Sequence, residues 1–290
     1  MKKIFNRLMC LFAAVALVSA CNSNNNEGND TITEQYINEC FTYVADAVDG
    51  TRAYYDGMGF QLRLNFTKAT ANLLVHGLKL NDGTVYPDFT LADMPFRTDN
   101  DGWIEITAPT VTPSMSGFAA PTFTNVKVRL YQRIVNGIYV PAFTARFTVN
   151  QRSAVTAALK VQYFWGDTES TASTGSKFET TETSYALRFH ADTRTVDITM
   201  SRSQFIGAMP ALDIELKAVP FNIMGDKAYI EAASIIPYIG DTPYTTYPIS
   251  NLKAEVNFGG DFDMQFDCAP QNVPGSPYHV EADADVKPLE

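Results

Sequence analysis

Histidine, cysteine and serine side chains are the usual carriers of catalysis or metal binding, and their spacing here argues against both. The three histidines, His76, His190 and His279, are scattered along the chain. No pair has the spacing of a zinc-binding His-Glu-x-x-His motif, and no Cys-x-x-Cys pair occurs. No Gly-x-Ser-x-Gly motif marks a serine hydrolase nucleophile. The sequence therefore predicts no catalytic, metal-binding or cofactor-binding residue.

Aromatic residues near carboxylates are the remaining candidates for a binding site. Glu105 follows Trp103, and Glu231 follows Tyr229, with the two pairs 126 residues apart. Each pair could bind a sugar, because an aromatic ring can stack on it while a carboxylate accepts its hydrogen bonds. The simpler interpretation is a pair of outward-facing strand residues kept by common ancestry. With two loop tyrosines that could contact sugars or proteins, the candidate ligand contacts are Trp103, Glu105, Tyr229, Glu231, Tyr244 and Tyr247.

The start of the chain predicts export and lipidation. Three Lys or Arg residues precede the apolar run 8–17, which is too short to span a bilayer. The run closes at residues 18–21 with Val-Ser-Ala-Cys. This ending resembles the bacterial lipobox, in which the cysteine is acylated and becomes the first residue of the mature protein. The resemblance implies a signal peptide over residues 1–20 and a membrane anchor through lipid on Cys21.

Residues 21–35 are expected to form a disordered tether, because 22–30 contains no apolar side chain. An Asn-rich, acidic tether behind a lipobox resembles surface-exposed lipoproteins of the Bacteroidetes type. The resemblance implies a lipid-anchored protein at the outer membrane or cell surface. Loss of the leader would remove three positive charges and take the formal net charge from −10 to −13. So acidic a chain has no electrostatic footprint for nucleic acid.

Two cysteines remain in the folded part. Cys10 lies in the leader and Cys21 is assigned to lipid, which leaves Cys40 and Cys268 near opposite ends of the sequence. A compartment outside the cytoplasm permits a disulfide. Pairing would require the first and last strands to be neighbours. Two buried free thiols are the simpler expectation.

The chain contains an internal duplication. Residues 60–64 (FQLRL) recur as residues 185–189 (YALRF), 125 residues later. Pro95-Phe96 matches Pro220-Phe221 at the same offset. This repeat has the length of a small domain, not of a solenoid unit. We therefore expect two tandem copies, and a loose tail after them. The expected boundaries are 36–150 for the first copy, 151–270 for the second and 271–290 for the tail.

Each copy has the sequence pattern of antiparallel β-strands. Apolar and polar residues alternate in 60–66, 126–130 and 252–258, as in strands with one buried face. Asn136-Gly137 has the composition of a hairpin turn. About seven such strands per copy are most typical of a β-sandwich. The sequence thus predicts an all-β protein of two tandem antiparallel β-sandwiches; a single larger sandwich or barrel shared by both copies is the alternative.

These features favour a non-catalytic binding protein displayed outside the cytoplasm. Its ligand would be a glycan or a surface protein, held by loops at one end of a sandwich. A fimbrial subunit or anchor is the first alternative, although no donor strand is evident in the sequence. A glycan-active hydrolase is the second, because its two carboxylates are recognised by their separation in space, which sequence does not give.

Overall fold

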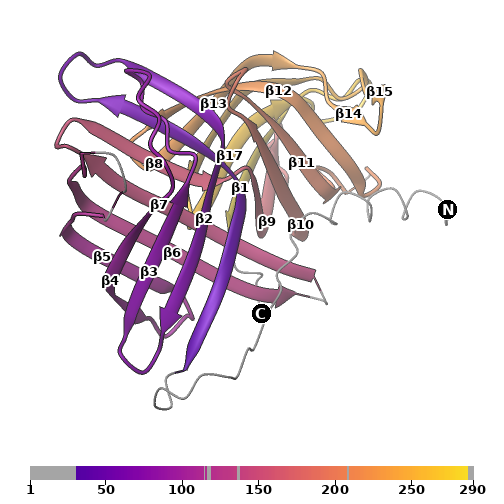
Figure 1. Cartoon of the computed structure of the whole chain (residues 1–290). Coiled ribbons are helices and arrows are strands. Elements are labelled where there is room, and N and C mark those ends of the chain that lie inside the picture. Colours follow the sequence, from indigo (N-terminus) through magenta and orange to yellow (C-terminus); the bar gives the residue numbers. More distant parts are fainter. Residues whose placement is uncertain (1–30, 114, 116–118, 136–137, 208, 287–290) are drawn as a thin grey trace.

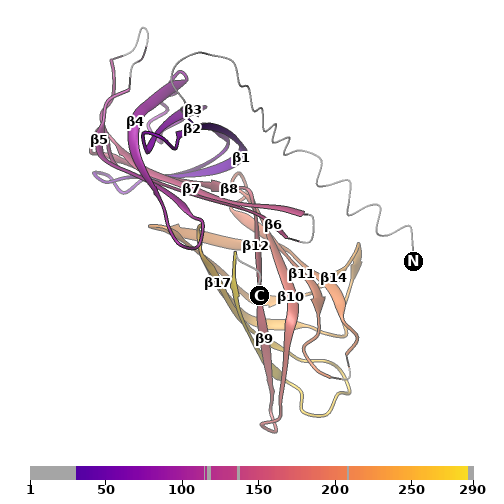
Figure 2. The same cartoon turned by 90° about the horizontal axis from the view of Figure 1, so that it is seen from below.

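The fold consists entirely of β-strands arranged in two closed barrels (Figures 1 and 2). A computed structural model describes residues 31–286 except 114, 116–118, 136–137 and 208. Within this part of the chain every regular element is a strand. The predicted all-β class and the two-copy organisation are therefore confirmed.

Barrel 1 is an eight-stranded up-and-down barrel. Each strand pairs with the next in the chain, and β8 returns to pair antiparallel with β1, from Cys40 opposite Leu159 to Asp46 opposite Ser153. This closure leaves no free sheet edge. Its strands are β1 (Ile32–Asp46), β2 (Arg52–Asn65), β3 (Thr70–His76), β4 (Phe89–Thr98), β5 (Ile104–Val111), β6 (Phe123–Val135), β7 (Ile138–Val149) and β8 (Ser153–Leu159).

Barrel 2 repeats this plan. Its eight strands also pair in chain order, and the last strand, β18, pairs with the first, β9. A short hairpin, β14 (Tyr238–Ile239) and β15 (Thr242–Pro243), is added beside β12. The barrel strands are β9 (Val161–Ala172), β10 (Lys177–His190), β11 (Thr195–Ser203), β12 (Leu212–Met224), β13 (Lys227–Ile235), β16 (Ile249–Asn257), β17 (Asp261–Cys268) and β18 (Tyr278–Asp285).

The prediction that each copy is a β-sandwich is wrong, and the predicted boundaries of the copies and of the tail are wrong as well. Alternation of apolar and polar residues shows only that a sheet has one buried face, and a barrel satisfies it as well as a sandwich. β8 belongs to the first copy, which ends at Leu159 and not at residue 150. The expected loose tail, 271–290, contains β18, whose alternation Tyr-His-Val-Glu-Ala-Asp-Ala-Asp buries only small side chains and Val280. β1 likewise starts inside the expected tether, at Ile32.

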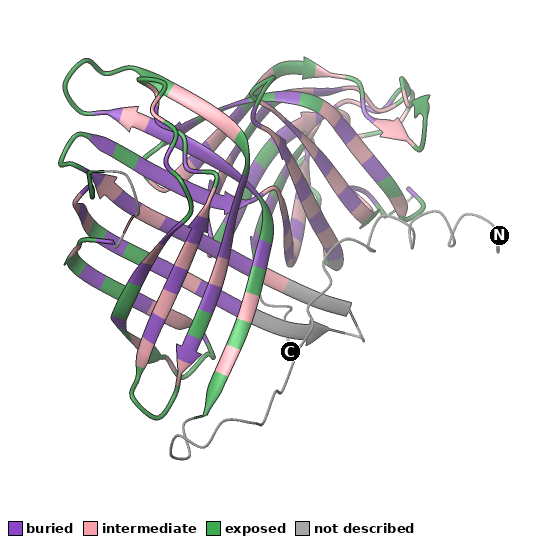
Figure 3. Cartoon of the chain, in the orientation of Figure 1, coloured by how far each residue is buried: buried purple, intermediate pink, exposed green. Residues whose placement is uncertain are grey.

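Side chains alternate between the barrel interiors and solvent. The burial of β3 and of β9 changes at every residue, and Figure 3 shows the resulting stripes on most strands. Large apolar side chains fill both interiors, so each barrel is a packed core rather than a pore. The predicted Asn136-Gly137 turn lies outside the described residues, although Val135 and Ile138 on either side of it pair as a hairpin.

The two copies share backbone irregularities as well as strand order. The β3–β4 ladder shifts register after Ala71, and the β11–β12 ladder shifts after Val196, 125 residues later. Asp93 and Ala218, also 125 residues apart, both have positive φ, at 53° and 54°. Such bulges are specific features of a strand. The duplication is therefore confirmed strand for strand.

Pro95 and Pro220 occupy equivalent places, as predicted. Pro95 is the last residue of β4 to pair with β3, and Phe96 is the first to pair with β5. Pro220 and Phe221 stand at the same change of partner in β12. Proline has no N–H to donate, so the change of neighbour is a position that tolerates it.

One end of barrel 2 is closed by the outer wall of barrel 1 (Figure 2). Phe41 of β1 faces away from the barrel 1 core and is fully buried in the core of barrel 2. Its ring stacks on Phe189 at 4.9 Å and meets Phe258 edge-on at 5.5 Å. Polar contacts surround this packing: Tyr54 Oη lies 3.2 Å from Asn222 Oδ1.

The chain passes between the barrels through a single residue, Lys160, which lies between β8 and β9. Both backbone groups of Lys160 are bonded. Its N–H donates to Glu39 O at 2.9 Å in barrel 1, and its carbonyl accepts from Phe189 N at 2.8 Å in barrel 2. The linker is therefore part of the interface.

Replacing Phe41 by Ala should destabilise the protein by about 3–5 kcal/mol, because it removes a fully buried ring and leaves a cavity between the barrels. Denaturant unfolding measures the loss. Phe66→Ala is the matched control, because it deletes the same atoms from a ring that is 44% exposed. We expect a clearly smaller loss there; equal losses would contradict a structural role for the inter-barrel contact.

Candidate binding site at the free end of barrel 2

Barrel 2 has a free end opposite the one that barrel 1 covers. Its longest connections lie there: segment 204–211 follows β11, segment 236–248 follows β13, and segment 269–277 follows β17. At the equivalent end of barrel 1 the β7–β8 connection is shorter, residues 150–152, whereas the β3–β4 connection, residues 77–88, is longer than segment 204–211. Loops at the end of a rigid barrel are a common location for binding.

Two of the predicted contacts, Tyr244 and Tyr247, meet at this end. Their rings stack with centroids 4.9 Å apart and an interplanar angle of 11°. Backbone bonds hold the turn, since Tyr244 N donates to Pro237 O at 2.7 Å and Tyr247 N donates to Tyr244 O at 3.3 Å. Both side chains are partly exposed. We call this pair the tyrosine platform.

Contacts with the barrel 2 core and with the β17–β18 loop hold the tyrosine platform in place. Tyr247 packs against the barrel 2 core. The pKa of the Tyr247 phenol is raised, first by partial burial and second by the nearby Tyr244 phenol. Gln271 N donates to Thr246 O at 3.1 Å, which ties the loop that carries the platform to the β17–β18 loop. The rings are therefore held in place before any ligand arrives.

An open depression of about 550 Å³ is a second feature of barrel 2. It lies where the first half of β10 runs beside the β11–β12 loop. The ladder between β10 and β11 begins only at Ser184, so residues 177–183 pair with β9 alone. The depression is lined by Phe178, Glu179, Thr180, Thr181 and Gln204.

Trp103 and Glu105 do not lie at this end, and Trp103 is only 4% exposed. The Trp103 ring packs under the Arg129 guanidinium, whose Cζ is 4.3 Å from the ring centroid, and it belongs to the inter-barrel core. Glu105 forms ion pairs with Arg97 at 2.5 Å and with Arg129 at 3.3 Å. These contacts give both residues a structural role in barrel 1.

The expected equivalence of the two aromatic–carboxylate pairs is wrong. Ile106 and Ile230 pair with equivalent phenylalanines of β4 and β12, so matching residues of β5 and β13 are 124 apart, not 126. Glu105 therefore corresponds to Tyr229 and not to Glu231. The cause is the length of the turn that precedes β5 and β13. Measured between equivalent ladder positions, this turn is one residue shorter in barrel 2 than in barrel 1, whereas alignment of the two sequences implies that it is one residue longer.

Tyr229 and Glu231 lie on the side wall of barrel 2. Glu231 is exposed and stands opposite Lys253 on β16. Tyr229 is partly exposed and stands opposite Glu255. Of the six predicted contacts, the fold thus brings together only Tyr244 and Tyr247.

The cysteines and histidines remain apart. Cys40 and Cys268 are buried free thiols in separate barrel cores, so they are not paired. Burial raises the pKa of both thiols, that of Cys268 to about 12. No group of three metal-ligating side chains occurs among the described residues. Each histidine instead contacts one aspartate: His76–Asp88 at 2.7 Å, His190–Asp197 at 2.9 Å and His279–Asp267 at 2.9 Å.

The chain matches no protein-family model, and no curated protein matches its sequence. Within the described residues no helix is long and apolar enough to cross a membrane. The predicted signal peptide, residues 1–20, and the predicted lipidation site, Cys21, lie outside the described residues.

The outer wall of barrel 2 carries a row of facing carboxylates that sequence reasoning missed. Asp263 stands opposite both Asp283 and Glu255 on the neighbouring strands. Like charges directly opposite each other are destabilising. The pKa of Asp263 is raised by burial first and then by the negative charges of Asp283, Asp261 and Glu255. The positive charge of Lys227 lowers it. Strand register alone would have revealed the row.

Asp263→Asn should therefore raise the thermal midpoint at neutral pH. A raised pKa in the folded state favours the protonated acid, so the contribution of Asp263 to stability is full below the ordinary aspartate pKa and is lost as pH rises through the folded pKa. The benefit of the amide should accordingly vanish in acid, as thermal unfolding against pH would show. Asp192→Asn, in the exposed β10–β11 turn, is the control. An equal gain from both variants, or a gain independent of pH, would contradict the account.

Proposed function

We propose that this protein is a lipid-anchored binding protein outside the cytoplasm, and that the tyrosine platform of barrel 2 binds carbohydrate. The observation that carries the proposal is the stacked pair Tyr244 and Tyr247, held partly exposed among the long loops of a free barrel end. Tyrosine offers an apolar face for stacking and a hydroxyl for hydrogen bonds, which together suit the faces and hydroxyls of a sugar.

The surroundings of the platform support a neutral ligand and a non-catalytic role. No charged residue is an immediate chain neighbour of Tyr244 or Tyr247, which lie in Thr-Pro-Tyr-Thr-Thr-Tyr-Pro. A hydrolase of the usual kind would need two carboxylates across a bound sugar. The fimbrial alternative is disfavoured, because a closed barrel offers no open sheet for a donor strand.

Tyr244→Ala and Tyr247→Ala should each weaken oligosaccharide binding about tenfold or more, because each removes a rigid aromatic contact. A glycan array would identify the ligand, and calorimetry on the purified full chain would measure the affinities. Tyr229→Ala is the matched control, since Tyr229 is also partly exposed but lies on the side wall. Binding that is lost in Tyr229→Ala and retained in both platform variants would reject the proposed site.

The anchor is the second part of the proposal, and its support is the resemblance of residues 18–21 to a lipobox. Cys21→Ser should abolish incorporation of an alkyne fatty acid during growth and release the protein from the membrane fraction, or leave an uncleaved precursor. Cys10→Ser, in the leader, should label as the parent chain does. Labelling that persists in Cys21→Ser would refute the assignment.

A further inference from the structure

Buried hydroxyl groups line the interior of barrel 2 near its free end. Each comes from an inward-facing position on β9, β10 or β11, and each residue is at most 2% exposed. We call this set the hydroxyl cluster. Its members are Thr168, Ser170, Thr183, Tyr185 and Ser203.

Barrel 1 provides an internal comparison for this cluster. The strand registers show which residues of the two barrels are equivalent. Met58 pairs with Cys40 in barrel 1, and Thr183 pairs with Gly166 at the same place in barrel 2. Four cluster positions are apolar in barrel 1, where their counterparts belong to its hydrophobic core. The correspondences are Val44 with Ser170, Met58 with Thr183, Phe60 with Tyr185, and Leu78 with Ser203.

The difference is confined to one end of the barrel. Deeper in the two cores the equivalent residues stay apolar in both copies, as with Leu62 and Leu187 or Leu73 and Ile198. The packing of this fold therefore does not require polar groups at these four positions, whereas the fifth, Thr168, corresponds to Thr42, a buried threonine of barrel 1. The hydroxyls need another explanation.

The cluster is only partly satisfied by internal hydrogen bonds. Thr168 Oγ1 and Tyr185 Oη are 2.6 Å apart, and Ser170 Oγ donates to the Phe205 carbonyl. Ser203 Oγ is buried and has no hydrogen-bond partner among the described residues. Thr183 is buried as well, and its side chain interacts with the Tyr185 hydroxyl. A buried hydroxyl without a partner costs free energy that an apolar side chain of the same shape would not.

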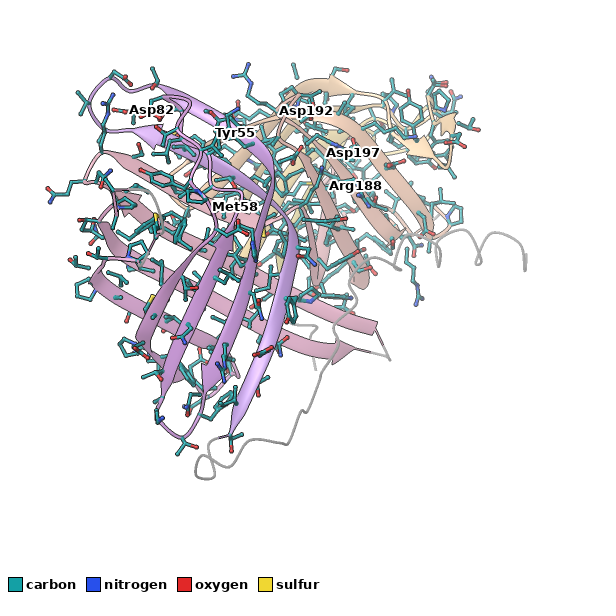
Figure 4. The ribbon with its side chains drawn as sticks, viewed as in Figure 1. Tyr55, Met58, Asp82, Arg188, Asp192 and Asp197 are labelled. Atoms are coloured by element: carbon teal, nitrogen blue, oxygen red, sulfur yellow. The ribbon has the colours of Figure 1, made fainter. Side chains whose placement is uncertain are left out.

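The open depression lies beside the cluster along the chain. Gln204, which lines it, follows Ser203, and Thr181, which also lines it, is two residues from Thr183. In barrel 1 the equivalent of Thr180 is Tyr55, labelled with Met58 in Figure 4.

Barrel 1 fills this place with larger side chains. The Tyr55 hydroxyl donates to Leu80 O at 3.1 Å, and Lys79 lies over its ring at 4.8 Å. The counterparts in barrel 2, Thr180 and Gln204, are smaller or uncharged, and they line the depression instead. The two copies thus differ both inside the barrel and at the adjoining surface.

We propose that the hydroxyl cluster and the adjoining depression form a binding site for a single neutral polyhydroxylated unit, a monosaccharide residue. Its hydroxyls would partner Ser203 Oγ, which has no partner within the described residues, and Thr183 Oγ1, which interacts with Tyr185 in the cluster. A neutral ligand fits because no cluster member carries a charge, and Glu179, the charged residue that lines the depression, would repel an anion. The site shares no residue with the tyrosine platform, so either proposal can fail without the other.

The test measures binding of D-glucose, D-galactose, D-mannose and N-acetyl-D-glucosamine to the purified full chain by ligand-induced thermal shift and saturation-transfer NMR. Thr183→Val and Ser203→Ala delete these two hydroxyls with little change of shape. Each should weaken binding of the preferred sugar about tenfold. Without sugar, Ser203→Ala should not lower the thermal midpoint, since it removes an unsatisfied buried group.

Three controls make the result decisive. Thr144→Val removes another buried unpaired hydroxyl, on β7, and should bind as the parent does. Tyr244→Ala should leave monosaccharide binding unchanged, which separates this site from the platform. Combining Thr183→Met with Ser203→Leu restores the side chains of barrel 1 and should abolish binding. Failure of all four sugars to bind, or equal binding by the parent, Thr183→Val and Ser203→Ala, would overturn the proposal.

Discussion

The arrangement of the molecule depends on the burial of one side chain of barrel 1 in the core of barrel 2. Phe41 lies on β1, a strand that closes barrel 1 through its pairing with β8, yet its ring contacts Phe189 and Phe258 at the end of barrel 2. A barrel needs its ends covered as well as its sheet closed, because apolar side chains at the end would otherwise meet water. Barrel 1 supplies that cover with its wall, so the two copies have unequal roles.

This asymmetry explains how duplicated sequences diverged. The covered end of barrel 2 is constrained by packing, while its opposite end carries the hairpin β14–β15, the hydroxyl cluster and a β17–β18 connection longer than its counterpart in barrel 1. Barrel 1 keeps apolar residues such as Val44 and Leu78 at the places where barrel 2 has Ser170 and Ser203. Barrel 1 therefore covers one end of barrel 2, and the candidate binding features lie on barrel 2.

Local sequence patterns predicted the strands well but not their closure. Alternation at residues 60–66 identified a half-buried strand, and the repeat of Pro95-Phe96 identified the duplication, because both depend on near neighbours in the chain. Barrel closure depends on pairing between Cys40 and Leu159, more than a hundred residues apart, which alternation does not encode. β18 was missed because its inward side chains are mostly alanines, and small residues give a weak hydrophobic signal.

The candidate site was predicted only in part, for a similar reason. Tyr244 and Tyr247 stood out because two tyrosines in a Pro- and Thr-rich stretch indicate a loop. Thr183 and Ser203 look like ordinary strand residues, and their significance appears only beside Met58 and Leu78. A register error of two residues made Glu105 and Glu231 look equivalent, which shows how strongly a β-structure prediction depends on the lengths of its turns.

The one-residue link at Lys160 has a consequence for motion. Its N–H and its carbonyl are each bonded to a different barrel, so bending there would break hydrogen bonds on both sides and expose the ring of Phe41. Most two-domain chains can reorient about their linker. This chain should instead rotate in solution as one elongated particle, with a single rotational correlation time for both halves.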